Sequence, residues 1–184
     1  LLFIGIVITC LYLYYSGTYN WNDSISQGTF QLVSIMTTTG FATTEFNAWP
    51  TFLPFFLLFL SFFGACAGST GGGIKIGRML ILGKQGIREI YRLVHPNAIL
   101  PIKISNRQIP ERVADAIWAF VGVYLAIFYL MVLLLLASGL DYVTAWSATA
   151  AALNNLGPGL GAVATNYADI GSFAKWVLCW GMLL

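Results

Sequence analysis

The sequence predicts an all-α membrane protein built from tandem repeats, each made of a helix, a short re-entrant helix with a loop, and a second helix. Composition is the first observation, because 58% of the 184 residues are hydrophobic and only 9% are charged, whereas about 25% are charged in soluble domains. The second is a charge-free run of twenty residues, Trp118–Ala137, long enough to span a bilayer. The third is a glycine loop that follows a short, weakly apolar run at two separate places.

The first predicted repeat opens with the apolar residues 1–15. They form the end of a spanning helix, because about 20 residues are needed to cross a bilayer. The next run, Ile25–Met36, is amphipathic, too short to cross and too apolar to be solvated. Asp23 or Ser24 is expected to cap its start, and Gly40 is expected to end it. These features predict a re-entrant pore helix.

A second spanning segment follows and is predicted to break at membrane depth. Residues 46–74 carry no charge, and the stretch 64–73 holds five glycines in ten residues. Each glycine costs a helix about 1 kcal/mol. Helical sequence resumes over 74–92, so two half-helices are expected on either side of a glycine-rich segment.

The same order of segments recurs in the second half of the chain. The charge-free span is followed by a short run rich in Ala, Thr and Ser, Tyr142–Leu153, by the loop 154–161, and by a further helix from Phe173. The two signature glycines, Gly40 and Gly157, lie 117 residues apart. We therefore predict parallel repeats around an axis along the membrane normal. The predicted units are a first repeat, a cytoplasmic connector and a second repeat truncated in its last helix: 1–92, 93–112 and 113–184.

Positive charge is concentrated in one window of the sequence. Of nine Lys and Arg residues, eight lie between Lys75 and Arg112, and only Lys175 lies outside. Short loops rich in Lys and Arg stay on the cytoplasmic side of a membrane. Residues 75–112 are therefore predicted to face the cytoplasm, with both glycine loops opening toward the opposite side.

The two glycine loops are candidate binding segments for a monovalent cation. A dehydrated ion inside a membrane needs oxygens that replace its water, and backbone carbonyls can supply them. Glycine favours this geometry because it adopts positive φ and lets successive carbonyls face one axis. In this interpretation the ion contacts carbonyls, and one threonine hydroxyl, of Thr38, Thr39, Gly40, Phe41, Asn155, Leu156, Gly157 and Pro158. The alternative is that the threonines bond back to helix carbonyls and Gly40 only caps the helix.

The glycine-rich segment between the half-helices is a candidate gate. Non-helical backbone at membrane depth is tolerated only where protein buries it or water wets it. The proposed gate residues are Gly68, Ser69, Thr70, Gly71, Gly72, Gly73 and Lys75. Nucleotide binding is not expected, because Ile74 stands where a phosphate-binding loop has its lysine and no Ser or Thr follows Lys75. Lys75 either places a charge near the path or marks the inner end of the helix.

Two other classes of function fit parts of the sequence. A membrane scaffold would use the glycines only for close helix packing. A secondary transporter of another small ion, an anion, would use Lys75 as a counter-ion at a half-helix N-terminus. Enzymatic chemistry is not expected, since the cysteines are isolated and His95 has no nearby ligand set. The Trp and Tyr residues at 19, 21, 49, 142 and 167 are expected in interfacial belts.

Four separated stretches, 37–43, 64–75, 94–98 and 154–161, resemble the bacterial TrkH-type potassium uptake proteins of the Trk/Ktr/HKT superfamily. The similarity covers essentially the whole chain, and the related KtrB proteins look more distant around Cys66. The resemblance implies a potassium-channel-like fold of four joined repeats around one potassium path. This chain would be the third repeat and most of the fourth. Gly40 and Gly157 would be the filter glycines, and 68–73 the intramembrane loop that obstructs the path.

The same resemblance implies partners and a location. It implies the remaining pore repeats of the same protein, a homodimer, and a cytoplasmic, nucleotide-binding TrkA-type regulatory subunit touching residues 84–112. The expected surroundings are the lipid of the bacterial inner membrane, with K⁺ as the transported ion, no other cofactor and no nucleic acid. The arginine that faces the loop in this family would lie beyond Leu184.

Overall fold

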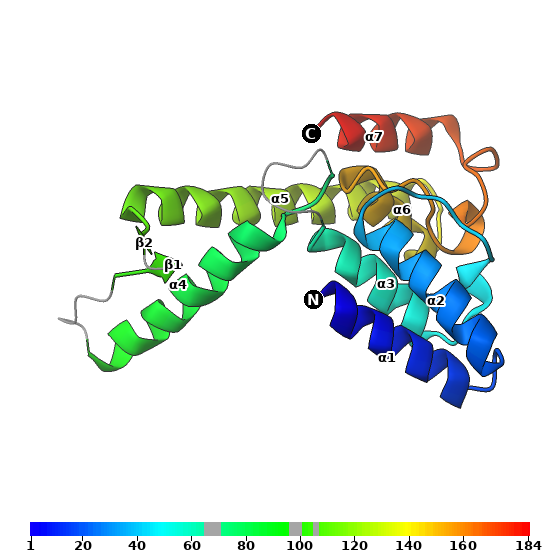
Figure 1. Cartoon of the computed structure of the whole chain (residues 1–184). Helices are drawn as coiled ribbons and strands as arrows, with labels where there is room; N and C mark the ends of the chain where they lie inside the picture. The colour runs from blue at the N-terminus through cyan, green and yellow to red at the C-terminus, as the bar shows by residue number, and fades with distance from the viewer. Residues whose placement is uncertain (65–70, 96–100, 105–106) are drawn as a thin grey trace.

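The computed structural model describes residues 1–64, 71–95, 101–104 and 107–184, and this part is mostly helical (Figure 1). In chain order the elements are α1 (Leu2–Tyr15), α2 (Trp21–Met36), η1 (Phe46–Ala48), α3 (Phe52–Phe62), α4 (Ile76–Val94), β1 (Lys103–Ile104), β2 (Arg107–Gln108), α5 (Glu111–Ala137), α6 (Tyr142–Leu153), η2 (Gly161–Val163) and α7 (Ser172–Leu183). The predicted all-α class is confirmed. The one addition is a short antiparallel hairpin of β1 and β2 in the connector, which the sequence analysis did not predict.

The first repeat packs α2 against both α1 and α3. Leu13, Leu32 and Leu57, one from each helix, are fully buried in the core between them. Because α2 buries one face this way, a helix too short to cross a bilayer is still held firmly. The pore helix predicted from the amphipathic run is therefore present.

The start of α2 differs from the prediction. The helix begins at Trp21, and Asn20 has the extended backbone of an N-cap, with φ −66° and ψ 163°. Asp23 lies in the first turn, where its carboxylate is favoured by the positive end of the helix dipole. Ser24 is buried and donates to the Tyr19 carbonyl at 3.3 Å. The prediction that Asp23 or Ser24 caps this helix is wrong.

The second repeat packs α6 against α3, α5 and α7. Small residues of α6, including Ala145, Ala148 and Ala150, are fully buried and let the neighbouring helices approach closely. Within the described residues, α5 is the one helix long and apolar enough to cross a membrane, with a mean hydropathy of 2.7 over an 18-residue window. Asp141 caps α6 by accepting a hydrogen bond from the Thr144 N–H at 3.1 Å.

The predicted helix break lies between α3 and α4. Gly73 and Lys75 have φ of +81° and +65°, values that an α-helix does not contain. The Ile74 N–H donates to the Phe62 carbonyl at 3.0 Å, so the end of the broken segment returns to the end of α3. Consequently α4 begins at Ile76, slightly later than the sequence predicts.

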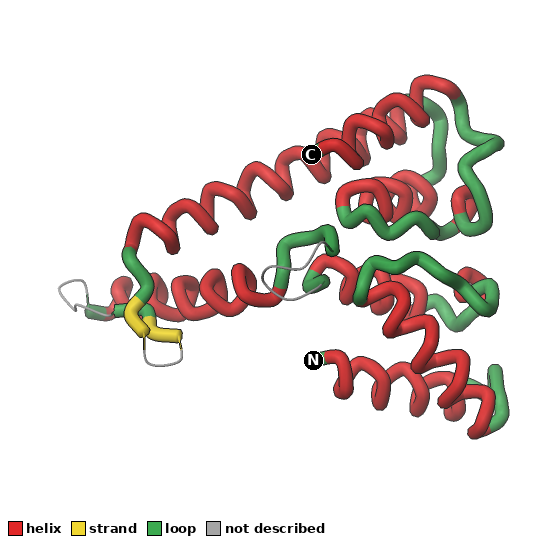
Figure 2. The backbone as a smooth tube through the Cα atoms, turned by 45° about the horizontal axis from the view of Figure 1, so that its top comes forward, coloured by secondary structure: helices red, strands yellow, loops and turns green. Residues whose placement is uncertain are grey.

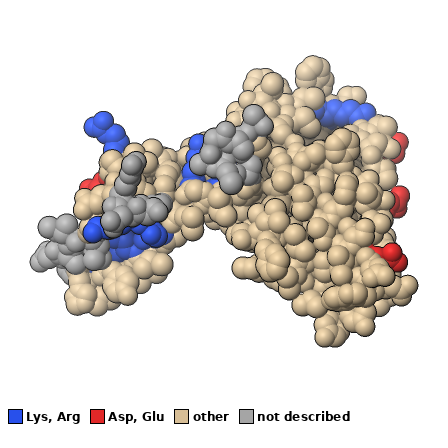
Figure 3. Space-filling model, viewed as in Figure 1, with Lys and Arg blue, Asp and Glu red and all other residues tan. Residues whose placement is uncertain are grey.

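Helix α4 and the first half of α5 extend away from the other helices and meet the hairpin at their far end (Figures 1 and 2). Arg78 of α4 lies over the Phe120 ring of α5, 4.2 Å from its centroid. Arg88 is buried and lies 3.4 Å from the Glu111 carboxylate. Most of the visible Lys and Arg side chains gather over this pair of helices (Figure 3). The basic window of the sequence is therefore one region of the structure.

Candidate functional site

Two loops with the same hydrogen-bond pattern follow the short helices α2 and α6. In both, the first residues after the helix donate their N–H groups to carbonyls of the last turn, at 3.1 or 2.9 Å. The donor and acceptor pairs are Thr38 with Ile35 and Thr39 with Ser34, then Asn155 with Ala152 and Leu156 with Ala151. Each residue of the second set lies 117 positions after its counterpart. The offset between the two signature glycines therefore also relates the local structures.

The backbone torsions repeat in the same way. Thr38 and Gly40 have φ of +55° and +79°, and Asn155 and Gly157 have φ of +50° and +99°. A regular extended chain alternates the direction of successive peptide groups, and a positive φ at every second residue breaks that alternation. A simple helix cap needs one such residue, whereas each loop has two. This is the torsion pattern that a carbonyl-lined segment requires.

The two loops contact each other. A Cβ placed on Gly40 would overlap the Leu156 carbonyl oxygen and lie 3.4 Å from Cδ of Pro158. The segments after the loops are joined as well, because the Gly161 N–H donates to Oδ1 of Asn47 at 3.2 Å. The structure therefore brings together the two segments that the sequence analysis singled out.

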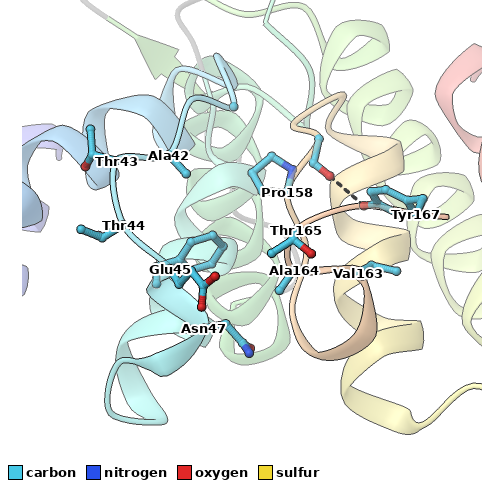
Figure 4. A pocket seen from close by; sticks show the side chains of 13 residues that line it. Ala42, Thr43, Thr44, Glu45, Asn47, Pro158, Val163, Ala164, Thr165 and Tyr167 are labelled. Atoms are coloured by element: carbon cyan, nitrogen blue, oxygen red, sulfur yellow. Dashed lines mark hydrogen bonds between the residues drawn. The ribbon is translucent and has the colours of Figure 1, made fainter. Parts of the chain in front are cut away.

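A pocket of about 560 Å³ opens where the loops meet (Figure 4). Gly40 and Glu45 line it from the first repeat, and Gly157, Pro158 and Tyr167 line it from the second. Glu45 is exposed and contributes the one carboxylate among the described residues that line the pocket. Both glycines therefore line one pocket, which also holds this single carboxylate.

Two of the carbonyls predicted to face an ion already accept hydrogen bonds from side chains. Oγ of Ser34 donates to the Phe41 carbonyl at 2.6 Å, and the Tyr167 hydroxyl donates to the Gly157 carbonyl at 2.7 Å. A carbonyl oxygen has two lone pairs, so each keeps one for a further partner. These carbonyls are held in place by the protein.

The threonine hydroxyls of the first loop bond within the loop. Oγ1 of Thr37 donates to the Val33 carbonyl at 2.6 Å and shares a 2.8 Å hydrogen bond with Oγ1 of Thr39. For Thr37 this is the back-bonding that the alternative interpretation predicts. The protons of these two hydroxyls are thereby used within the loop, while lone pairs remain on their oxygens.

The described end of the glycine-rich segment packs against the base of the second loop. A Cβ on Gly72 would overlap the Asn154 carbonyl, and one on Gly73 would lie 3.2 Å from Oδ1 of Asn154. Asn154 is fully buried and directly precedes the second candidate ion-binding segment. Of the predicted gate residues, Gly72 and Gly73 make this contact, Gly71 and Lys75 flank them in the chain, and Gly68, Ser69 and Thr70 lie outside the described residues.

Asn154 also links three helices through polar bonds. The Tyr124 hydroxyl of α5 donates to Oδ1 of Asn154 at 2.8 Å. Nδ2 of Asn154 donates to Oγ of Ser61 in α3 at 2.7 Å, and Ser61 donates to the Leu58 carbonyl at 2.6 Å. The base of the second loop is thereby fixed to the long helix of its own repeat and to α3 of the first.

Sequence reasoning missed the structural roles of Ser34, Asn154 and Tyr167. The interfacial-belt expectation for the Trp and Tyr residues stays a prediction, and within the protein Trp49 is 4% exposed in the first core cluster. The Tyr167 ring is partly buried and packs against the second core cluster beside the loop. Hydropathy does not indicate which of the aromatic residues near the ends of the spans pack against protein. The available signal was Asn154, an amide at the end of an otherwise apolar run.

The chemistry of the site is that of neutral oxygens. Over the described ranges, no group of three or more His, Cys, Asp or Glu could hold a metal ion. Carbonyl oxygens suit a monovalent cation, because conduction requires binding that is favourable but weak enough to reverse. Two short helices, α2 after α1 and α6 after α5, end in loops that meet, and this arrangement defines the chain as part of a pore-loop membrane protein.

The chain belongs to the TrkH family of cation transport proteins, whose family model matches residues 6–184. It is 44% identical over 179 residues to the Trk system potassium uptake protein TrkH of Halomonas elongata, covering 97% of this chain and 37% of that protein. It is 47% identical over 188 positions to TrkH of Escherichia coli K12, with coverages of 99% and 39%. The crystal structure of the potassium transporter TrkH from Vibrio parahaemolyticus superposes with a TM-score of 0.91 at 49% identity, covering 99% of this chain and 39% of that one. The chain thus spans 37–39% of the length of these relatives.

Proposed function

We propose that this chain is part of a membrane subunit that translocates potassium ions, and that its two glycine loops supply part of the ion filter. The names of the related proteins support potassium as the ion. The observation that carries the proposal is the contact of Gly40 with the Leu156 carbonyl, made by two loops with the same torsion pattern.

In this proposal an ion exchanges its water for main-chain oxygens as it passes the loops. The contributing carbonyls are those of Thr38, Thr39, Gly40 and Phe41, then Asn155, Leu156, Gly157 and Pro158. They form part of a ring, and repeats of the same protein outside this chain would supply the remainder. Because the two loops differ in sequence, such a ring should discriminate among cations less sharply than four identical strands.

The gate and the orientation are proposed on separate grounds. Residues 68–75 are proposed as the gate, because Gly72 and Gly73 lie against Asn154, directly before a filter segment.

Residues 75–112 are proposed to face the cytoplasm of a bacterial inner membrane, because they hold eight of the nine Lys and Arg residues. Residues 84–112 would then receive a TrkA-type regulatory subunit, in a homodimer surrounded by lipid.

Flux measurements test the proposal. The full-length protein that contains this chain, reconstituted in liposomes, is expected to take up potassium faster than sodium and to do so whichever anion is present. Empty liposomes give the background. Uptake that depends on the anion and not on potassium would favour the anion transporter, and flux no higher than background would favour the scaffold.

A further inference from the structure

Tyr167 donates a hydrogen bond to the carbonyl of a proposed filter glycine. The two oxygens lie 2.7 Å apart, the usual distance for an O–H···O bond. Figure 4 shows the ring reaching toward the loop from the segment that precedes α7. Apart from Gly157 and its two chain neighbours, no atom of the described residues lies within 4 Å of the place that a Cβ of Gly157 would take. The hydroxyl is therefore a direct restraint on a peptide group that has open space beside its Cα.

Tyr167 is itself held firmly. Its ring packs against the second core cluster, which includes Val163 and Ile170. The next turn is fixed at Ala168, whose N–H donates to Oδ1 of Asn166 at 2.9 Å and whose carbonyl accepts from Nζ of Lys175 at 2.8 Å. A short turn fixed on both sides holds the tyrosine as a rigid support for the loop.

The hydroxyl keeps its proton under all physiological conditions. Burial raises the pKa of Tyr167 to about 12, because a phenolate is poorly solvated there. Tyr167 is therefore a donor toward the Gly157 carbonyl at any pH at which the protein works.

Side chains donate hydrogen bonds to carbonyls at different positions in the two loops. Among the described residues, no side chain donates to the Gly40 carbonyl, whereas Ser34 donates to the carbonyl of the following residue, Phe41, at 2.6 Å. In the second loop the restrained carbonyl belongs to the glycine itself. The donor at Gly157 therefore has no equivalent at the matching position of the first repeat.

We propose that Tyr167 is a specificity-determining residue that positions the Gly157 carbonyl for a potassium ion, a role that rests on the proposed function of the loops. One lone pair of the carbonyl accepts the tyrosine proton, and the other remains for the ion. The restraint limits how far the carbonyl can move toward a smaller cation. Without it the carbonyl can close around Na⁺, so the preference for K⁺ falls. Tyr167 acts through the carbonyl and is a positioning residue, not a ligand.

The substitution Tyr167→Phe in the full-length protein tests this inference, because it removes the hydroxyl and keeps the ring. The ratio of K⁺ to Na⁺ uptake into liposomes is expected to fall about threefold to tenfold, the factor that corresponds to one hydrogen bond, while K⁺ uptake continues. Tyr142→Phe is the matched control: it makes the same change in a ring that is 63% exposed at the start of α6. Its ratio should stay at the wild-type value.

Thermal unfolding of the purified variants separates ion selection from general stability. Tyr167→Phe is expected to lower the unfolding temperature by no more than the loss of one hydrogen bond, and Tyr142→Phe is expected to unfold at the wild-type temperature. An unchanged or higher K⁺ to Na⁺ ratio in Tyr167→Phe would overturn the inference, as would an equal fall in Tyr142→Phe. If the wild-type protein shows no potassium uptake, the proposed function fails first, so the two failures are distinguishable.

Discussion

At the scale of single residues, Gly40 and Gly157 share a positive φ but differ in their surroundings. Both torsions orient the peptide groups of a loop. A Cβ on Gly40 would also overlap the Leu156 carbonyl, whereas a Cβ on Gly157 would meet no atom within 4 Å. Gly40 is therefore required by its torsion and by its neighbour, and Gly157 by its torsion alone.

This difference predicts an order of effects. Gly40→Ala is expected to impair potassium uptake by the full-length protein more than Gly157→Ala. Both changes place a side chain at positive φ, at a cost of roughly 1–2 kcal/mol, but only the first drives a methyl group into the opposite loop. Initial uptake rates at matched protein amounts measure the effect. Gly139→Ala is the control, because Gly139 has φ of +90° and open space around it at the end of α5. Equal effects at Gly40 and Gly157 would contradict the contact between the loops.

Asn154 is expected to stabilise the fold through the two hydrogen bonds of its side chain. Asn154→Ala is expected to lower thermal stability by more than Tyr124→Phe, because it leaves both the Tyr124 and the Ser61 hydroxyl without the amide. Each lost bond inside a helical membrane protein costs roughly 0.5–1.5 kcal/mol. The measurement is the unfolding temperature of purified protein. Tyr129→Phe is the control, because Tyr129 lies in α5 like Tyr124 but is exposed. It should leave the unfolding temperature unchanged. A Tyr124→Phe protein as stable as the wild type would argue against the network.

At the scale of elements, α6 shows how a short helix is stabilised. It has 12 residues, and isolated helices of that length are marginal in water. Its buried alanines pack against three helices, and Asp141 satisfies an N–H at its first turn. Hydrogen bonds from Thr144 lower the pKa of Asp141. The cap is therefore ionised at neutral pH, where it also favours the helix dipole.

The cap predicts a pH dependence. Because the pKa of Asp141 is lower in the folded protein than in the unfolded chain, its contribution is present above the unfolded pKa and is lost as pH falls through the folded value. Asp141→Ala is expected to cost roughly 0.5–1 kcal/mol at pH 7, and less in acid. Asp141→Asn should keep most of the cap and remove its pH dependence. Unfolding temperatures between pH 3 and pH 7 test this, and equal losses for Ala and Asn would contradict it.

Element boundaries were the weakest sequence predictions. Hydropathy and glycine content predicted each long and short helix and the break between α3 and α4. They misplaced the start of α2, because Asn20 adopts the cap conformation before Asp23 or Ser24 can. They missed the hairpin, because strands of two residues are too short for an alternating pattern.

At the scale of the whole molecule, the essential feature is that α2 and α6 deliver their loops to one place. Helix α3 lies between them in the chain and packs against both. Arg88 and Arg92 join α4 to Glu111, the first residue of α5, and most of the visible Lys and Arg side chains gather over these two helices where they extend away from the others (Figures 1 and 3). The loop region and the basic region are therefore separate parts of the structure.

This arrangement predicts where an ion will be found. In crystals of the full-length protein grown with rubidium in place of potassium, anomalous scattering should give a peak in direct contact with carbonyls of both loops, beside Gly40 and Gly157. Rubidium is the appropriate probe because its charge matches and its anomalous signal identifies it. Crystals grown with sodium should give no such peak. Rubidium bound elsewhere and absent from this position would refute the filter assignment.

Hydropathy, charge and glycine positions were enough to predict the membrane character, the tandem order of short and long helices, the helix break and the two glycines at an offset of 117 residues. These follow from local properties, since hydropathy and glycine torsions act over a few residues. The contact of Gly40 with Leu156, the hydrogen bonds of Asn154 with Ser61 and Tyr124, and the hydrogen bond from Tyr167 to Gly157 are visible in the folded chain alone. Such partners are chosen by how whole helices pack, and residues far apart in the chain leave no local pattern that identifies them.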